Sequence, residues 1–550
     1  MSPQPSGNNS NLQRGGACVN CRRRKMRCDG VHPICGQCDH AGRPDDCEYV
    51  VGQERSRTQI LEENISRLEA RIQELQNPHQ ANPSITLHQP YSHGQPSGRG
   101  SRNIAPSSDL SSTSSQDPPV NVAQQLLDHF LPFASEFGFF LNASRFQASA
   151  LTQKPQGHPS RPAPALMTTA YLWGIHLSRD PSLLAHEQTY LTRALQQTST
   201  ALSGNHPNKV IHGLQAEVLL AYYFFANGRF LEGKYHVTAA VSISVSAGLN
   251  KIRSRNPTSA VASISPARDS VEEGERINAC WTVFTLDKCW AAALDTPPNL
   301  IDPTDKLDAQ IDTPWPMEMS EYEQGRFPTN VRTSQTIQKF LSGTQTADVG
   351  MSSKAILAKS ALLWERVSDL ARSWYPGMSQ HHFASFSSAF AAVDSVIDRL
   401  KSSLPPLSQV MRTVNNPETL RTLAVAYSMI NGSILRLHNI LAQGSESSTR
   451  KRMSAAQGVV DVVTSIQSRS LVHLNPIIGT IWVDASQILI NELSNMRTLR
   501  ASYSMAHPTE AENSLTHGFE RGLTAIEAFS RSCTLTNYQV RKIQETYAAL

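Results

Sequence analysis

Six of the nine cysteines in this chain of 550 residues fall within the 30 positions from Cys18 to Cys47. Their spacing is C-x2-C-x6-C-x6-C-x2-C-x8-C, which is two C-x2-C pairs, each followed by a lone cysteine. The chain begins with the polar residues MSPQPSGNNS, so we expect no export to an oxidising compartment. Clustered cysteines in an intracellular protein are typical of metal ligands rather than disulfides. The candidate ligands are Cys18, Cys21, Cys28, Cys35, Cys38 and Cys47.

The number of sulfur atoms indicates the kind of metal site. Structural zinc takes four tetrahedral thiolate or imidazole ligands. Two separate zinc ions would need eight donors, whereas a single ion would leave two cysteines unused. If two thiolates each bridge both metals, six sulfurs supply eight contacts, so we predict one binuclear cluster with two Zn²⁺ per chain. His32 is a candidate seventh donor, but beside Pro33 in the connecting loop it is better explained as a bystander.

The two halves of the cysteine stretch differ in charge. Two Zn²⁺ and six thiolates carry a net negative charge, so basic residues nearby are favourable. No acidic residue lies between Cys18 and Cys28, whereas the half that begins at Cys35 contains three aspartates. Lysine and arginine bind phosphates and the edges of guanine, so the first half is suited to DNA, although any one of its cations alone could be a solvated charge. The candidate DNA-binding residues are Arg22, Arg23, Arg24, Lys25 and Arg27.

The pattern C-x2-C-R-x2-K-x2-C, with Pro33 and the second C-x2-C pair after it, closely resembles the fungal zinc binuclear-cluster transcription factors. The resemblance implies that Cys18 and Cys35 bridge the two zinc ions. It also implies that a short helix after Cys21 enters the major groove and reads a CGG-like triplet, with Arg24 and Lys25 at the base edges. A regulator of RNA polymerase II genes in the nucleus is the function that this family suggests, and the run RRRK at 22–25 could serve as an import signal.

A short heptad pattern follows the cysteine stretch. Isoleucine at a positions and leucine at d positions favours a parallel two-stranded coiled coil, so we expect a homodimer. The alternative is an amphipathic helix that docks on its own domain. A flexible connector from Cys47 to Thr58 would reach roughly 17–20 Å and place two triplets about one DNA turn apart, or closer if Tyr49, Val50 and Val51 pack on the module. The candidate dimerisation residues are Leu61, Ile65, Leu68, Ile72 and Leu75.

The rest of the chain reads as helical. From about residue 120, apolar residues recur three and four apart, and the segment 272–298 is apolar nearly all round, which predicts a buried central helix. The segments 228–250 and 275–301 look like the fungal-specific transcription factor domain, which in the family is an all-α regulatory domain. Residues 312–350 read as a loop. We therefore predict an all-α protein with a small N-terminal zinc binuclear cluster, a short coiled coil, a disordered linker and a large α-helical regulatory domain.

This interpretation divides the chain into six parts. The linker is rich in Pro, Ser, Gln and Gly and offers little apolar material for a core. The expected parts are a disordered tail (1–13), the zinc module (14–50), a connector with the dimerisation helix (51–76), the disordered linker (77–119), the fungal-specific domain (120–330) and further helices of the regulatory region (331–550).

Several patterns that suggest other chemistry are weak. The sequence from Gly228 to Lys234 fits G-x4-G-K, but Tyr235 follows where a phosphate-binding loop needs Ser or Thr. Cys280 and Cys289 would lie on opposite sides of a helix and are expected in the core. Asp287 would be buried on the same helix, and we predict an ion pair with another helix. No nucleophile and base come together, so we predict no enzyme activity.

The function predicted from these residues is that of a sequence-specific DNA-binding transcription regulator. One alternative is a metabolite-sensing or enzyme-like helical protein that carries the zinc module as a DNA-targeting appendage, and another is a zinc protein that acts only through protein partners. The expected partners are double-stranded DNA, a second copy of the chain, a small-molecule effector and the transcription machinery. We expect no membrane association, because no apolar run approaches the ~20 residues of a membrane span.

Overall fold

The computed structural model describes residues 16–44, 47, 49, 117–255, 264–300, 310–328, 330–344, 346, 348, 350–469, 471–503, 505, 507–531 and 533–550. The chain divides into two compact units, one that ends at Asp109 and one that begins at Leu110. The regular secondary structure of the described residues is helical, apart from one isolated β-bridge between Ser254 and Thr333. This confirms the all-α prediction. The predicted dimerisation helix, with Leu61, Ile65, Leu68, Ile72 and Leu75, lies outside the described residues.

In the described part of the first unit, residues 16–49 with gaps, there are two helices of five residues, α1 (Val19–Arg23) and α2 (Gly36–His40). Each begins directly after the first cysteine of a C-x2-C pair. That cysteine is the N-cap, and its sulfur accepts the backbone N–H of the second cysteine at 3.4 Å in both helices. Helices this short are not stable in isolation, so the cysteine cluster must hold them in place.

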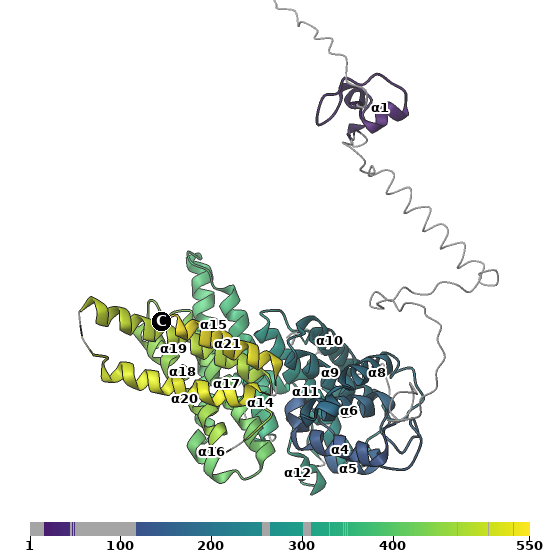
Figure 1. The fold of residues 1–550 in the computed structure, drawn as a ribbon, viewed down its shortest axis with the longest axis vertical. Helices are drawn as coiled ribbons and strands as arrows, with labels where there is room; N and C mark the ends of the chain where they lie inside the picture. Colours follow the sequence, from purple (N-terminus) through teal and green to yellow (C-terminus); the bar gives the residue numbers. More distant parts are fainter. Residues whose placement is uncertain are drawn as a thin grey trace, which may run out of the picture. The chain divides into compact units, whose positions relative to one another are not determined.

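The second unit is a large helical domain, in which Figure 1 shows the blue and teal helices on one side and the green and yellow helices on the other. Its first helices are α4 (Val120–Phe130), η2 (Leu131–Phe137), α5 (Ala143–Ala150), α6 (Pro164–Ser178), α7 (Pro181–Leu184), α8 (Glu187–Ser199), α9 (Lys209–Ala226), α10 (Phe230–Ser246), η3 (Leu249–Lys251) and α11 (Ser270–Ala293). They are followed by α12 (Met319–Glu323), α13 (Thr336–Ser342), α14 (Ser353–Ser373), α15 (Gln380–Ser403), α16 (Leu407–Thr413), α17 (Pro417–Asn439), α18 (Glu446–Ser468), α19 (Ile477–Ser502), α20 (Glu510–Ser530) and α21 (Thr534–Ala548).

Helix α11 is the central helix of this domain, as predicted. Its residues are buried on every side, and it packs against α9, α10, α14 and α19. The hydrophobic core runs without a break from α4 to α21, so the helices on both sides of residue 330 share it. The boundary that we placed at residue 330 stays a prediction. None of the described helices combines the length and apolarity that a bilayer crossing requires.

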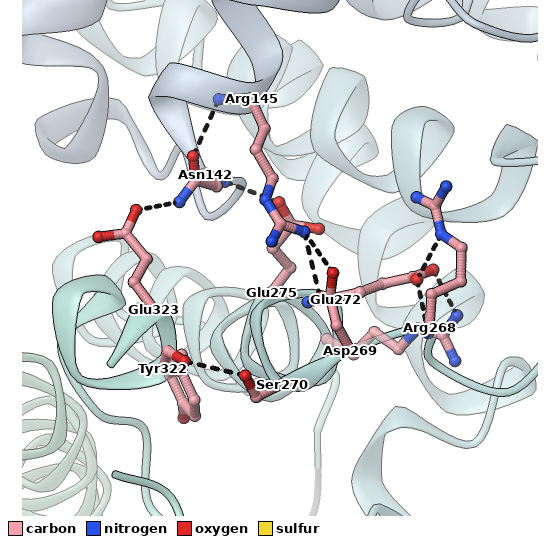
Figure 2. Close-up of polar contacts among 10 residues, drawn as sticks. Asn142, Arg145, Arg268, Asp269, Ser270, Glu272, Glu275, Tyr322 and Glu323 are labelled. Atoms are coloured by element: carbon pink, nitrogen blue, oxygen red, sulfur yellow. Dashed lines mark hydrogen bonds and ion pairs between the residues drawn. The ribbon is translucent and has the colours of Figure 1, made fainter. Parts of the chain in front are cut away.

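A network of polar contacts fixes the start of α11 to two neighbouring helices (Figure 2). The Asp269 carboxylate accepts the Glu272 N–H at 2.9 Å and binds Arg145 of α5 at 2.8 Å. Asn142, the N-cap of α5, donates its side-chain amide to Glu323 of α12 at 2.6 Å and its backbone N–H to Glu275 at 2.8 Å. The network therefore sets where the central helix enters the core.

Two expectations about the domain were wrong. Asp287 is buried, but its carboxylate is held by the backbone N–H groups of Asn299 and Leu300 and by the Asn299 side chain rather than by an ion pair. The ion pair between helices lies one residue further on, where Lys288 binds Glu365 of α14 at 3.3 Å. Residues 312–350 are not only loop, because they contain α12, which Glu318 caps, and α13.

The weak patterns have structural explanations. Cys280 and Cys289 are both buried in the core, as expected. Gly228, at the start of the G-x4-G-K pattern, forms the turn between α9 and α10 with a positive φ of 72°. Its context is therefore helix–turn–helix, which is not the strand–loop–helix context of a phosphate-binding loop.

Candidate metal centre and nucleic-acid interface

The structure brings all six predicted cysteines together in one cluster. Their sulfur atoms form two groups of four, and within each group all atoms lie within 4.8 Å of one another. Both groups contain Cys18 and Cys35. The first group adds Cys21 and Cys28, and the second adds Cys38 and Cys47. Six sulfurs thus provide two sets of four donors.

The distances between the sulfur atoms fit zinc and exclude disulfides. The Sγ atom of Cys35 lies 3.7 Å from that of Cys18 and 3.6 Å from that of Cys21, and Cys18 and Cys38 are 3.7 Å apart. A disulfide would bring two sulfurs to about 2.05 Å. Four sulfurs at about 2.3 Å from a tetrahedral zinc ion lie about 3.8 Å from one another, so the observed spacing suits that ion.

Two thiols of this cluster, those of Cys18 and Cys21, are costly to ionise without a cation. Burial raises the pKa of the Cys21 thiol to about 12, and burial also raises the pKa of Cys18. Only the thiolate is a good zinc ligand, and a bound cation supplies the charge that favours it. The donor set and its surroundings therefore fit Zn²⁺, which would be held by sulfur alone and would serve here to fix the fold of the module.

Two residues near the cluster that are not ligands contact its sulfur atoms: Asn20, which was not predicted to take part, and Tyr49, which was considered only for packing on the module. Asn20 is buried and donates its side-chain amide to the Cys38 sulfur at 3.4 Å. The Tyr49 hydroxyl donates to the Val31 carbonyl at 3.0 Å and lies 3.6 Å from the Cys28 sulfur. The Tyr49 ring stacks on His32 with 3.9 Å between ring centroids. In the sequence, Asn20 and Tyr49 are distinguished only by their proximity to the cysteines.

His32 lies outside both sulfur groups and contacts the Gly30 carbonyl and the Tyr49 ring. This placement agrees with its interpretation as a bystander. Tyr49 packs on the module, whereas Val50 and Val51, which the same expectation named, lie outside the described residues.

The predicted DNA-binding residues form an exposed basic surface on α1 and the turn that follows it. Arg24 is the C-cap of α1, and Lys25 adopts a left-handed conformation with φ of 55°. Arg22 donates to the Ala17 carbonyl at 3.1 Å. The side chains of Arg22, Arg23, Arg24, Lys25 and Arg27 are all exposed. Arginine and lysine side chains presented from one short helix suit contact with phosphates and base edges in a major groove.

The backbone of the second half repeats that of the first. The N–H of Lys25 donates to Arg22 O at 3.2 Å, and that of Gly42 donates to Asp39 O at 3.0 Å, seven residues after Cys18 and Cys35 respectively. Both residues have positive φ, 55° for Lys25 and 65° for Gly42. The two halves therefore share a conformation and differ in the side chains that they expose.

Comparison with known proteins agrees with this geometry. Residues 16–56 match the fungal Zn(2)-Cys(6) binuclear cluster domain, and residues 130–411, just over half of the chain, match the fungal specific transcription factor domain. The fold and the site thus define a protein that has the zinc cluster domain and the helical domain of fungal transcription regulators. The chain belongs to the fungal transcription factors of the Zn(2)-Cys(6) family, whose members are not enzymes, in agreement with the prediction.

Similar proteins carry names of the same kind. The chain is 40% identical over 72 residues to the transcriptional activator protein acu-15 of Neurospora crassa, which covers 12% of this chain and 8% of the relative. It is 44% identical over 57 residues to the C6 finger domain transcription factor hasF of Aspergillus fumigatus, which covers 10% and 7%. It is also 24% identical over 320 residues to the notoamide biosynthesis cluster transcriptional coactivator notQ' of Aspergillus versicolor, which covers 55% and 58%. The chain thus spans less than two thirds of each of these relatives.

Proposed function

We propose that this protein is a nuclear, sequence-specific regulator of RNA polymerase II genes whose module holds two Zn²⁺ ions. The observation that carries the proposal is that two groups of four sulfurs share Cys18 and Cys35. These two thiolates would bridge the ions. Cys21 and Cys28 would complete the shell of one ion, and Cys38 and Cys47 that of the other.

The exposed basic surface is the proposed contact with double-stranded DNA. Arg24 and Lys25, at the end of α1, would read a CGG-like triplet in the major groove. Arg22, Arg23 and Arg27 would bind phosphates and set the orientation of the module. Support comes from the exposure of all five side chains and from the family's zinc cluster domain.

We further propose that the protein binds DNA as a homodimer through Leu61, Ile65, Leu68, Ile72 and Leu75. Because Tyr49 is fixed on the module, the free connector runs from Tyr49 to Thr58. A flexible chain of that length averages roughly 15–18 Å, so two such connectors would span about 30–36 Å. One DNA turn is about 34 Å, so two triplets about one turn apart would suit the dimer.

The helical domain is proposed to regulate this DNA binding or its outcome, through a small-molecule effector and contacts with the transcription machinery. Its extent, and the extents of the zinc module at 14–50, the coiled-coil segment at 51–76 and the linker at 77–119, remain part of the proposal. The match of residues 130–411 to the fungal specific transcription factor domain supports a regulatory role.

The experiment is to measure binding of the full chain to DNA probes with two CGG triplets whose separation is increased one base pair at a time. We expect one optimal separation, which disappears in the Leu68→Asp variant because a charge at a d position disrupts the coil. Ser66→Asp adds the same charge at a b position of the same heptads and should leave the optimum in place. Equal affinity at every separation would contradict the dimer, and no preference for CGG over scrambled triplets would contradict the base-reading role.

A further inference from the structure

A cleft of about 880 Å³ opens in the helical domain beside α13, α14 and α15. Its walls come from parts of the chain that are far apart in sequence: Arg255 after η3, the segment 330–336, and residues of the three helices. This volume lies within the range of about 300–1,000 Å³ that small-molecule sites occupy in proteins.

The charges that line this cleft are strongly unbalanced. Five of the lining side chains are cationic, and Asp348 is the one carboxylate among the described residues of the lining. Asp348 already accepts the backbone N–H of Trp315. The cationic side chains are Arg255, Arg332, Lys339, Lys359 and Arg399. A concave surface with this imbalance concentrates anions.

Three of these cations are hydrogen-bonded to neutral oxygen atoms. The Lys339 ammonium donates to the Ser334 hydroxyl at 3.0 Å. Arg399 of α15 donates to the backbone carbonyls of Phe340 and Leu341 at 3.1 and 2.9 Å. Arg255 donates to the carbonyl of Arg332 at 3.2 Å. These contacts orient the cationic groups but leave their charge without a carboxylate partner among the described residues.

Lys359 of α14 places a fourth cation deep in the same wall. It is buried, and its ammonium donates to the Gly350 carbonyl at 2.7 Å. The ammonium lies 4.8 Å from the centre of the Trp315 ring and 5.3 Å from that of Phe340. Burial lowers the pKa of Lys359 to about 8, although the nearby Asp348 carboxylate acts in the opposite direction, and a further anion would favour the charged form of Lys359. Phe340, Met351 and Leu400 add apolar surface that suits a carbon skeleton.

We propose that this cleft binds a small organic anion that carries carboxylate or phosphate groups. Lys339 of α13 and Arg399 of α15 would bind the anionic groups directly, and the buried Lys359 of α14 would add a third positive charge to the same wall. This inference deepens the proposal that a small molecule controls the regulatory domain, and it rests on that part of the proposed function. A bound anion would link α13, α14 and α15 through their cations.

The test is titration calorimetry on the full zinc-loaded chain in the absence of DNA, so that its outcome does not depend on DNA recognition. Citrate and inorganic pyrophosphate probe the carboxylate and phosphate sources, and triethyl citrate provides the same skeleton without charge. We expect saturable binding of at least one anion, no binding of triethyl citrate, and affinity that falls as salt is added.

Variants then locate the site. Lys339→Gln should weaken binding of the anion roughly 10- to 150-fold, since a hydrogen bond to a charged group contributes about 1.5–3 kcal/mol, and Lys339→Arg should restore most of it. Lys401→Gln removes an exposed cation of α15 that does not line the cleft and should leave the affinity unchanged. Absence of saturable binding by both anions, or equal affinity in Lys339→Gln and Lys401→Gln, would overturn the proposal.

Discussion

The zinc module and the helical domain are held together in different ways. The buried apolar residues of the module are Cys18, Cys21, Cys28, Cys35 and Cys38, with a few partly buried neighbours. The helical domain has a large continuous core in which four tryptophans are fully buried, namely Trp173, Trp281, Trp364 and Trp482. A core made of cysteines depends on what the sulfurs bind, whereas the larger core depends on the removal of apolar surface from water. Each unit should therefore respond to changes that leave the other intact.

The largest expected effect is loss of the module alone. Structural zinc contributes about 10–16 kcal/mol to small domains of this kind, so Cys18→Ser, which removes a sulfur shared by both groups, should unfold the module. We expect zinc content to fall from two ions per chain and specific DNA binding to disappear, while the thermal unfolding of the helical domain is unchanged. Cys533→Ser is the matched control, because Cys533 lies between α20 and α21, and it should retain zinc. Metal analysis and differential scanning calorimetry measure both outcomes. A ratio of one zinc per wild-type chain would contradict the binuclear centre.

The reverse change breaks the helical domain and spares the module. Trp173 is fully buried, stacks on Phe137 with ring centroids 3.9 Å apart, and donates its indole N–H to the Leu219 carbonyl at 3.0 Å. We expect Trp173→Ala to lower the free energy of unfolding of this domain by about 3–5 kcal/mol, as measured by urea titration. Zinc content should not change. Trp374→Ala, at the less buried end of α14, should cost less, and an equal cost would contradict the assigned core.

A buried carboxyl group sharpens the comparison between the two units, because its titration makes the stability of the helical domain depend on pH. Glu136 is buried, accepts from Arg421 at 3.3 Å and accepts the Asn475 N–H at 3.3 Å. Burial raises the pKa of Glu136 to about 7, despite the favourable charge of Arg421. The folded state then holds a proton that the unfolded state releases near pH 4.5. The contribution of protonated Glu136 to the stability of the folded domain is complete below pH 4.5 and is lost as the pH rises to about 7.

The variant Glu136→Gln keeps the shape of the side chain without titrating. Between pH 4.5 and 7.5, the stability of the wild type relative to Glu136→Gln should fall by about 3 kcal/mol. Urea titrations of both proteins at several pH values give this difference. Glu446→Gln, whose glutamate is 88% exposed, should run parallel to the wild type. A pH-independent difference between Glu136→Gln and the wild type would show that Glu136 does not titrate in this range.

The smallest effect concerns the surface of the module. Lys25→Ala should cost about 1–3 kcal/mol of affinity for cognate DNA and relax the base preference, with the fold preserved because the side chain is exposed. Arg27→Ala should weaken cognate and scrambled DNA equally and reduce the slope of log K against log salt by ~1. Fluorescence anisotropy at several salt concentrations separates the two roles. Equal losses on both DNAs for Lys25→Ala would assign Lys25 to phosphate binding.

The sequence predicted those features whose residues lie close together along the chain. The cysteine spacing is local, so it specified the proximity of all six sulfurs. The family resemblance implied a short helix after Cys21, whereas the observed helix begins earlier, at Val19, and contains Cys21. Contacts between segments far apart in the sequence could not be predicted, because they depend on how the helices pack. The carboxylate of Asp287 binds a loop rather than another helix, and Tyr49 folds back onto Val31. The cationic cleft combines Arg255 with Lys339 and Arg399, which no periodicity or spacing connects.

The left-handed residue that follows the short helix in each half of the module shows where fold and recognition compete. Gly42 adopts this conformation without a side-chain penalty, whereas Lys25 adopts it at a cost of about 1 kcal/mol. The backbone alone would favour glycine at both places, so the lysine is there for what its side chain contacts. The module thus gives up conformational stability at the position where it is proposed to read DNA. A Lys25→Gly chain would be the better-folded protein and the poorer regulator.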